Sequence, residues 1–358
     1  MAILKICIRN IMMGENMKIT KSLLATSISL AILFQSSPTM AADLIQNEAG
    51  WSGHAALGVG YVSMENSEIA GTKVLDLENK QINNYGSASS QSSVIPVING
   101  LIRYTLDDKA TEFFLGNSMD DYLRLDSSIA LGVRHDFKDT GIIGARLLVS
   151  ASPTEVYRDP LLTGANRSKA NRTSVGFGLK WEKIMESDFD FDFFAKSENI
   201  KKDRNGQSLV GTLITQDQQR TLRRDGTIGS AQLSYTYKIN ESNKLIPSAK
   251  FLGSNRDGSA RDNTAFEIQL QHVYTENQWL VKSTVSGGAS SFDNRNPVFN
   301  EKQDTTLWAA GMDVTYLQPF GLKNWGVNGG VLASTGNSDI KFYDTQIFVA
   351  HVGMVYSF

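Results

Sequence analysis

A closed, antiparallel β-barrel that spans a membrane is the fold class that the sequence predicts. Three observations lead to this prediction: an apolar leader near the N-terminus, side chains that alternate between apolar and polar along most of the chain, and connections that alternate between long and short. An all-β chain of about 14 strands, within a range of about 12 to 16, accounts for this pattern.

The leader has the features of a signal peptide. Two lysines precede an apolar run over residues 23–34, which is too short to cross a bilayer comfortably as a helix. Because small residues follow this run, we expect residues 17–41 to be removed and residues 42–358 to form the mature barrel. Residues 1–16 place another apolar stretch ahead of the lysines, and we expect them to be an over-extended start.

Composition excludes several classes of protein. The only cysteine, Cys7, lies ahead of the expected signal peptide, so the mature chain has no thiol for disulfides, nucleophilic catalysis or thiolate metal sites. The chain has 35 Lys and Arg residues against 37 Asp and Glu residues and no long basic run, which argues against nucleic acid as a partner. No later stretch reaches the length of apolar residues that a membrane-spanning helix needs.

The alternation of side chains predicts strands with one apolar and one polar face. Phe189, Phe191 and Phe193, for example, alternate with three aspartates. Most of the segments are long enough to cross a bilayer as tilted strands, which takes about 9–11 residues. The expected strands are 51–63, 93–106, 110–117, 122–137, 142–152, 172–183, 188–197, 226–239, 244–254, 264–274, 279–288, 305–317, 325–335 and 342–358.

The connections predict the orientation of the barrel. Long extracellular loops at one end and short periplasmic turns at the other are typical of outer-membrane barrels. The long connections are 64–92, 153–171, 198–225, 255–263 and 289–304, and the tight turns are 107–109, 138–141, 184–187, 240–243 and 275–278. Trp51, Trp181, Trp279 and Trp325 all fall at strand ends on the short-turn side, where an interfacial aromatic girdle is expected.

The last strand predicts how the barrel closes. Every second residue from Phe348 to Phe358 is apolar, which suits a strand with one lipid-facing side that pairs with the first strand. The chain ends on Phe358 with Tyr356 two places earlier. This resembles the signal by which the assembly machinery recognises outer-membrane barrels, so we expect Tyr356 and Phe358 to form the assembly signal.

The whole mature chain resembles a known family. The opening "GWSGHAALGVGYVSMEN", the long polar loop after it and the ending "MVYSF" are similar to a family of Gram-negative outer-membrane proteins that includes porin-like protein L of marine bacteria. The resemblance implies an integral outer-membrane barrel with porin activity. It lies in the overall pattern rather than in a catalytic motif, so no functional residue is carried over from it.

The polar face of the strands predicts the wall of a water-filled lumen. Only residues 42–50 precede the first strand, which is too short for a plug domain, so a barrel of this size has room for water. Both signs of charge are present, without the bias to one sign that gives a selective ring. The expected pore-lining residues are Asn99, Arg103, Asp126, Arg134, Arg146, Lys180, Asp190, Asp192, Lys238, Lys250, Glu267, Lys282 and Asp313.

The function that these features predict is passive diffusion of small hydrophilic solutes, without catalysis and without a cofactor or metal. The expected partners are outer-membrane lipid and lipopolysaccharide, the barrel-assembly machinery, periplasmic chaperones and the solutes. A loop-plugged barrel that serves as an adhesin or receptor surface is the alternative, and a barrel hydrolase is the less favoured one. No histidine lies in a recognisable neighbourhood of a serine and a carboxylate.

Four further patterns have a functional and a structural interpretation. His54 and His351 both face the lumen by parity, as a metal or pH-sensitive pair or as unrelated wall residues. "DFDFDF" lacks the glycine and glutamate of a calcium loop, so its aspartates are read as lumen-facing. Lys180 is expected opposite Asp190 or Asp192. The basic loop 198–225 either constricts the pore, contacts lipopolysaccharide phosphates or is a solvated surface loop, which we favour.

Overall fold

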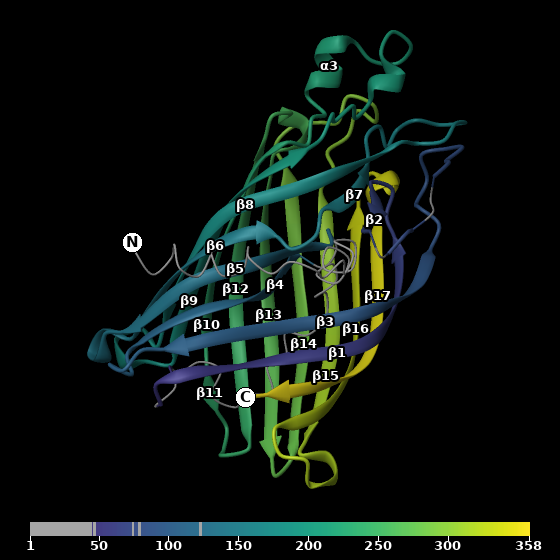
Figure 1. Cartoon of the computed structure of the whole chain (residues 1–358). Coiled ribbons are helices and arrows are strands. Elements are labelled where there is room, and N and C mark those ends of the chain that lie inside the picture. The colour runs from purple at the N-terminus through teal and green to yellow at the C-terminus, as the bar shows by residue number, and fades with distance from the viewer. Residues whose placement is uncertain (1–44, 46–47, 74, 78–79, 122–123) are drawn as a thin grey trace, which may run out of the picture.

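The chain folds into one closed antiparallel barrel (Figure 1). The computed structural model describes residues 45, 48–73, 75–77, 80–121 and 124–358. Within them, fourteen long strands form the barrel wall, as the sequence predicts. The expected signal peptide, the over-extended start and Cys7 lie outside the described residues. None of the described helices is long and apolar enough to cross a membrane.

The wall strands follow one another in chain order around the barrel. They are β1 (Gly50–Glu65), β3 (Gln91–Thr105), β4 (Thr111–Asp121), β5 (Asp126–Asp136), β6 (Ile142–Ser150), β8 (Lys169–Glu182), β9 (Phe189–Ile200), β10 (Gly226–Tyr235), β12 (Asn243–Arg256), β13 (Asn263–Glu276), β14 (Trp279–Phe292), β15 (Thr305–Leu317), β16 (Trp325–Ser338) and β17 (Thr345–Ser357). Strands on the near side of the barrel cross those on the far side in the view of Figure 1, because barrel strands tilt relative to the barrel axis.

Short elements lie in the connections. They are β2 (Ile69–Gly71), β7 (Thr154–Tyr157), β11 (Tyr237–Lys238), α3 (Gln216–Arg220), and the 3-10 turns η1 (Lys138–Thr140), η2 (Ile184–Glu186), η3 (Gln207–Leu209), η4 (Ser259–Arg261), η5 (Pro319–Gly321) and η6 (Lys341–Tyr343). β2 pairs with β7 and β7 with β8, so two long connections continue the sheet beyond the wall.

The first and last strands close the barrel, as the sequence predicts. β1 pairs with β17 from His54 opposite Ser357 to Glu65 opposite Gln346. The pairing reaches the final residue: the Gly53 amide donates to the Phe358 carbonyl at 2.9 Å, and the Phe358 amide donates to the Gly53 carbonyl at 3.0 Å. A Cβ at Gly53 would lie 2.1 Å from the Leu101 carbonyl oxygen, so this closing position has room only for glycine.

The predicted strands agree with the observed ones to within a few residues, and the alternation of faces is confirmed. Along β17, Phe348, Val352, Met354 and Tyr356 are exposed on the outer face, while the residues between them point inward. One strand start is wrong: β5 begins at Asp126 rather than at residue 122. Leu125 has a φ of +50° and is buried, so the backbone turns there and cannot extend the strand.

Aromatic side chains stack in pairs across neighbouring strands at the end with the short turns, which we name the turn end. The ring centroids of Trp51 and Tyr104 are 4.9 Å apart, those of Trp279 and Tyr316 are 4.8 Å apart, and those of Trp325 and Tyr356 are 5.1 Å apart. Offset or tilted aromatic pairs add to the stability that their burial provides. Three of the four predicted tryptophans therefore form cross-strand aromatic pairs in a girdle at this end, and Trp181 donates from its Nε1 to the Thr140 carbonyl.

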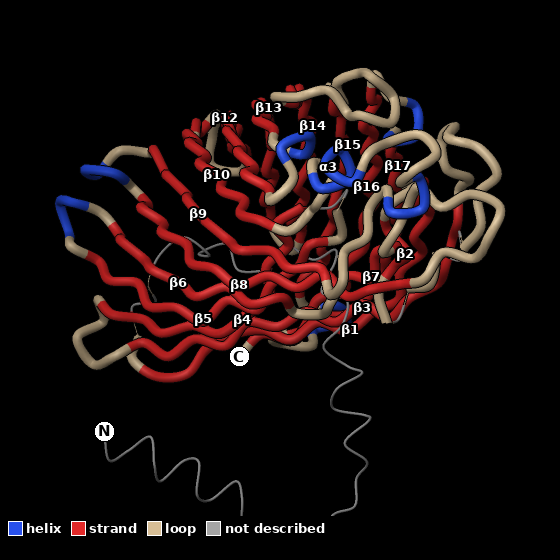
Figure 2. Tube along the Cα trace, turned by 90° about the horizontal axis from the view of Figure 1, so that it is seen from above, coloured by secondary structure: helices blue, strands red, loops and turns tan. Residues whose placement is uncertain are grey.

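The long connections gather at the opposite end, which we name the loop end. Figure 2 shows loops and α3 lying over one side of the barrel, beside the ends of β14, β15 and β16. The connection between β4 and β5 is the exception at this end, because it is only a few residues long. The loops are not independent of one another, since their apolar side chains form two buried clusters.

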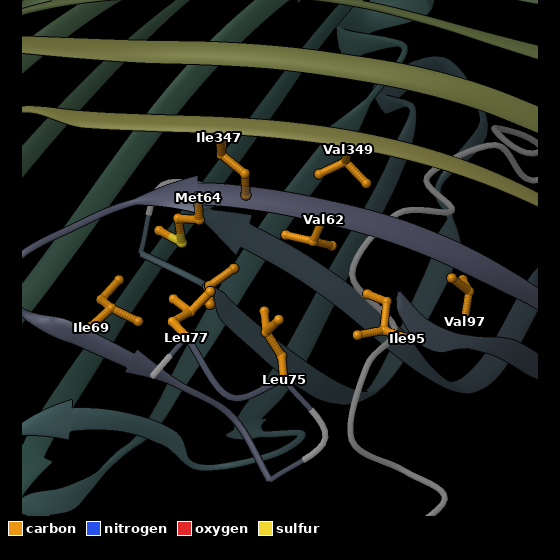
Figure 3. Packing of buried hydrophobic residues seen from close by; sticks show 10 residues of the cluster. Val62, Met64, Ile69, Leu75, Leu77, Ile95, Val97, Ile347 and Val349 are labelled. Atoms are coloured by element: carbon orange, nitrogen blue, oxygen red, sulfur yellow. The ribbon is translucent and has the colours of Figure 1, made fainter. Parts of the chain in front are cut away.

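The first cluster lies inside the barrel. Leu75 and Leu77, from the connection between β2 and β3, are 0% and 2% exposed. They pack against inward-facing apolar residues near the loop end of three adjacent wall strands (Figure 3): Val62, Met64, Ile95, Val97, Ile347 and Val349. Part of the long polar loop predicted over residues 64–92 therefore folds back onto the inner wall, and we name its described residues 69–73 and 75–77 the inner segment.

The second cluster joins loops from across the barrel, and we name it the loop core. Its buried residues are Leu161, Ile214, Leu222, Ala260, Ile340, Phe342 and Tyr343. The interpretation of 198–225 as a solvated surface loop is accordingly wrong in part. Lys201 and Lys202 are exposed, but Ile214, Leu222 and Arg224 are buried because this loop packs into the core of the others.

Candidate functional site in the lumen

The barrel encloses a cavity of about 1110 Å³ that extends along the lumen. At the loop end the cavity is lined by Glu68, Arg261 and Tyr343, and at the turn end by Ser242 and Lys244. Between these ends it is bordered by inward-facing side chains of the wall strands. The cavity thus connects the two ends of the barrel on the inside, beneath the loop core.

Ten of the thirteen residues that the sequence assigns to the lumen wall border this cavity. They are Arg103, Arg134, Arg146, Lys180, Asp190, Asp192, Lys250, Glu267, Lys282 and Asp313. Asn99 faces inward but is buried beside His54, whose Nε2 lies 3.2 Å from the Asn99 Oδ1. Asp126 is buried against Lys196, with 2.9 Å between Oδ2 and Nζ. Lys238 lies on β11 at the turn end, where 65% of its side chain is exposed.

A chain of ion pairs crosses the inner wall near the turn end. The Glu112 carboxylate is fully buried between two guanidinium groups, 2.9 Å from Arg134 Nε and 3.6 Å from Arg103 Nε. Arg134 also reaches Glu182 at 3.4 Å, and Lys180 Nζ contacts Glu182 at 2.8 Å. Because each buried charge has an opposite charge within contact distance, these pairs hold β3, β4, β5 and β8 in register.

A second pair connects β6 with β9. Arg146 donates from both terminal nitrogens to the two oxygens of Asp192, each at 2.8 Å. This is the bidentate geometry that makes arginine–carboxylate pairs strong and directional. Lys180 lies opposite Asp192 in the strand register, which is one of the two predicted arrangements, and its Nζ also contacts Glu182.

Three arginines surround one carboxylate near the loop end, and we name this group the Glu198 cluster. Arg124 Nη2 lies 2.6 Å from Glu198 Oε2, and Arg256 contacts the same oxygen. Arg172 lies on the neighbouring strand and acts electrostatically on Glu198. Gly226 pairs with Glu198 on one side and with Arg256 on the other, so no side chain stands between them. All three arginines border the cavity.

A second charged group lies directly beneath the loop core. Glu68 accepts from Arg261 at 2.7 Å and lies 3.6 Å from Arg224, whose Nη2 is 2.6 Å from Asp203. Burial alone would raise the pKa of Glu68, but Arg261 and Arg224 outweigh burial and hold this pKa below its usual value. Burial raises the pKa of Tyr343, which contacts the same group, to about 12. We name these residues the Glu68 cluster.

Of the two interpretations of His54 and His351, the structure excludes the pair and leaves two unrelated inward-facing residues. His54 lies opposite Ser357 in the strand register, whereas His351 lies opposite Gly60. Six residues along a strand separate the two positions by about 20 Å. His351 instead contacts Asn328 at 2.9 Å and Asp313 at 3.3 Å. Within the described part of the chain, no group of three or more His, Cys, Asp or Glu side chains is placed to hold a metal ion.

Several charged residues of the cavity are missing from the predicted set. Glu112, Arg172 and Glu182 fall within the predicted strands 110–117 and 172–183, where strand parity places them on the inward face, although they were not included in the predicted set. Arg256 is the last residue of β12 and lies two residues beyond the predicted strand 244–254. Glu68, Arg124, Arg224 and Arg261 lie in connections, where no periodicity predicts the direction of a side chain.

Comparison with solved structures gives barrels of low sequence identity. A Pseudomonas aeruginosa FadL homologue matches at 13% identity over 86% of this chain and 89% of that chain, with a TM-score of 0.43. The CymD monoaromatic hydrocarbon channel matches at 10% identity over 92% and 94%, with a TM-score of 0.43. The outer membrane channel DcaP of Acinetobacter baumannii matches at 13% identity over 88% and 99%, with a TM-score of 0.39.

The search of curated proteins gives no match to this sequence. A family model matches residues 50–357, from the start of β1 to the end of β17, so the match covers the whole barrel. On this match, the chain belongs to the family described as protein of unknown function DUF2860.

Proposed function

We propose that the protein is an integral outer-membrane channel through which small hydrophilic solutes diffuse passively. The observation that carries the proposal is the cavity of about 1110 Å³, which runs inside a closed barrel from the Glu68 cluster to Lys244 at the turn end. Charged and amide side chains on its wall offer hydrogen bonds to water and to polar solutes in place of those in bulk solvent.

The outer surface supports a membrane location. Leu57, Val94, Leu147 and Trp308 are each at least 60% exposed, and they lie on outward positions of the wall strands. Such a continuous apolar exterior with a polar interior is the inverse of a soluble protein, and lipid is the environment that favours it. The aromatic girdle lies at the turn end, where it would meet the periplasmic interface.

The same proposal assigns the partners. Outer-membrane lipid and lipopolysaccharide would surround the barrel, and small solutes would occupy the lumen. The barrel-assembly machinery and periplasmic chaperones would handle the unfolded chain, with Tyr356 and Phe358 as the assembly signal. The sequence resemblance to the family of porin-like protein L agrees with this assignment. No catalytic step is part of it.

A receptor or adhesin barrel is the second candidate, and the loop core favours it. Loops from six connections share one buried apolar cluster, and the inner segment covers part of the inner wall. A lumen closed by such packing would pass little current, and the ordered outer surface of the loops would then be the functional part.

Conductance separates the two candidates. The mature chain over 42–358, refolded in detergent and inserted into a planar bilayer in potassium chloride, is expected to give stepwise single-channel openings. Folding is checked by the shift in gel mobility between heated and unheated samples. A folded barrel without conductance would reject the channel and leave the receptor.

A further inference from the structure

The wall of the cavity carries more positive than negative charge. Among the described residues that border it, twelve are lysine or arginine and eight are aspartate or glutamate. The whole chain has a net charge of −2. The excess of positive charge in the lumen is therefore a local feature, opposite in sign to the protein as a whole, and the sequence-based expectation of a wall without bias is not met.

The excess lies at the loop end. Over the rest of the cavity wall, from its middle to the turn end, lysines and arginines equal aspartates and glutamates in number among the described residues. At the loop end, five arginines border the cavity: Arg124, Arg172, Arg224, Arg256 and Arg261. The described carboxylates in contact with these arginines are Glu68, Asp203 and Glu198, so five guanidinium groups gather around three described carboxylates.

The two clusters form one connected group. Arg256 Nη1 donates to the Arg224 backbone carbonyl at 3.1 Å, which links the Glu198 cluster to the Glu68 cluster. Arg224 is also fixed by donation to the Tyr157 carbonyl at 2.7 Å. Side chains that are held by packing and by backbone carbonyls lose little entropy on binding, so the arginines are pre-organised for a ligand.

Arg124 is the most accessible member of the group. Its side chain is 28% exposed, whereas those of Arg224 and Arg256 are each 7% exposed. Guanidinium groups bind carboxylate and phosphate oxygens through two parallel hydrogen bonds, a geometry that lysine cannot provide. A solute that reaches this end of the cavity meets the partly exposed guanidinium of Arg124, which is held by Glu198, and the field of four arginines behind it.

We propose that the arginine group at the loop end binds oxyanions, either carboxylates or phosphates, and makes the lumen selective for anionic solutes. This inference rests on the proposed channel function and specifies its substrate class. The field of the group would concentrate anions at the loop end and exclude cations of similar size.

The test compares two charge removals at opposite ends of the cavity. Arg124→Gln removes the accessible guanidinium, and Lys244→Gln, the matched control, removes a cation at the turn end. In a potassium chloride gradient, the reversal potential of the wild-type channel is expected to indicate a preference for chloride. Removal of Arg124 should lower the chloride-to-potassium permeability ratio about threefold, the effect of one charge at close range in water, and the control should lower it less.

Block by oxyanions tests the geometry of the site. Succinate and inorganic phosphate, as carboxylate and phosphate probes, should each reduce the chloride current of the wild type. The half-blocking concentration should rise about tenfold in Arg124→Gln, which loses a charge-assisted hydrogen bond, and also rise in Arg124→Lys, which keeps the charge but loses the fork. Block by only one probe identifies which oxyanion the site takes.

The outcomes distinguish this inference from the channel proposal. Conductance without a chloride preference, or block that is unchanged in Arg124→Gln, would overturn the oxyanion site and leave the channel in place. If the folded wild type has no conductance, the channel fails, and calorimetric titration of the detergent-solubilised barrel with the two probes decides the site. Binding that Arg124→Gln weakens would support the site in that case, and no binding to the wild type would overturn it.

Discussion

The inner segment is held to the barrel wall by two leucines, and replacing both should release it into the solvent. The double variant Leu75→Asn and Leu77→Asn removes two fully buried side chains from the cluster with Val62, Met64 and Ile95. Burial of one leucine contributes about 1.5–3 kcal/mol, so the two contribute about 3–6 kcal/mol. The docking equilibrium of the segment should shift by a factor on the order of one hundred to ten thousand.

Release of the segment would widen the lumen at the loop end. The assay is single-channel conductance in potassium chloride, where the double variant should give larger steps than the wild type. Leu213→Asn is the matched control, because Leu213 lies in another loop and is 57% exposed, so its replacement should leave the steps unchanged. Labelling offers a second readout. Because residues 42–358 contain no cysteine, a single Leu75→Cys should react slowly with a thiol reagent, and Leu213→Cys quickly.

Equal step sizes in the double variant and the wild type, with folding intact, would refute the reasoning that the inner segment narrows the conducting path. Rapid labelling of Leu75→Cys would refute the packing itself.

Three further predictions concern the wall, the loop end and assembly. Glu112→Gln should destabilise the barrel by about 3–5 kcal/mol, because it leaves two buried guanidinium groups without their shared carboxylate. The midpoint of urea unfolding should fall to a lower urea concentration than that of the control Glu241→Gln, which lies at an exposed turn. Equal midpoints in the two variants would contradict this prediction. The pKa of Glu68 is lowered in the folded state, so its ionised form stabilises the fold of the loop end above the usual pKa near 4.5, and this stabilisation is lost as pH falls through the lower folded pKa. The conductance step size should therefore change at acidic pH in the wild type and change less in Glu68→Gln. An identical pH profile in the two proteins would speak against the role of Glu68. Phe358→Ala keeps the backbone pairing with Gly53 but removes the aromatic ring; it should lower the assembled fraction in cells while refolding in detergent is unchanged, and normal assembly in cells would exclude Phe358 from the signal.

The wall of the barrel was predictable because its pattern is local. A strand in contact with lipid on one side and water on the other must alternate with a period of two, and this period is visible in each strand on its own. The Trp51 and Trp325 positions followed from the same register. The pairing of the first strand with the last followed from the requirement that no edge remain open. The register that sets Gly53 opposite Phe358 is a result of the structure.

The fold of the loops was not predictable, because it depends on contacts between distant parts of the chain. Leu75 and Leu77 are two leucines in a polar stretch, and nothing nearby indicates where they pack. The signal lay on the wall instead: Val62, Ile95 and Val349 are inward-facing apolar residues on adjacent strands, and in a water-filled lumen such a patch needs a cover. Placing the inward-facing residues of neighbouring predicted strands side by side would have revealed this apolar patch.

The candidate site was predictable only in the middle of the strands. Arg103 and Arg134, which strand parity places on the inward face, border the cavity, but their ion pairs with Glu112 depend on the three-dimensional register of the strands. These pairs decide which residues are useful probes of selectivity. Charge reversal at Arg103 or Arg134 would place like charges beside a buried carboxylate and disrupt the wall, whereas Arg124 is accessible enough to be changed.

Single-channel conductance of the refolded wild-type barrel over 42–358 tests the proposed channel most directly. Stepwise openings are expected in the wild type, and larger steps in the Leu75→Asn and Leu77→Asn variant. A folded wild type that stays silent, with openings only after the inner segment is released, would contradict an open lumen and indicate a barrel plugged by its own loop.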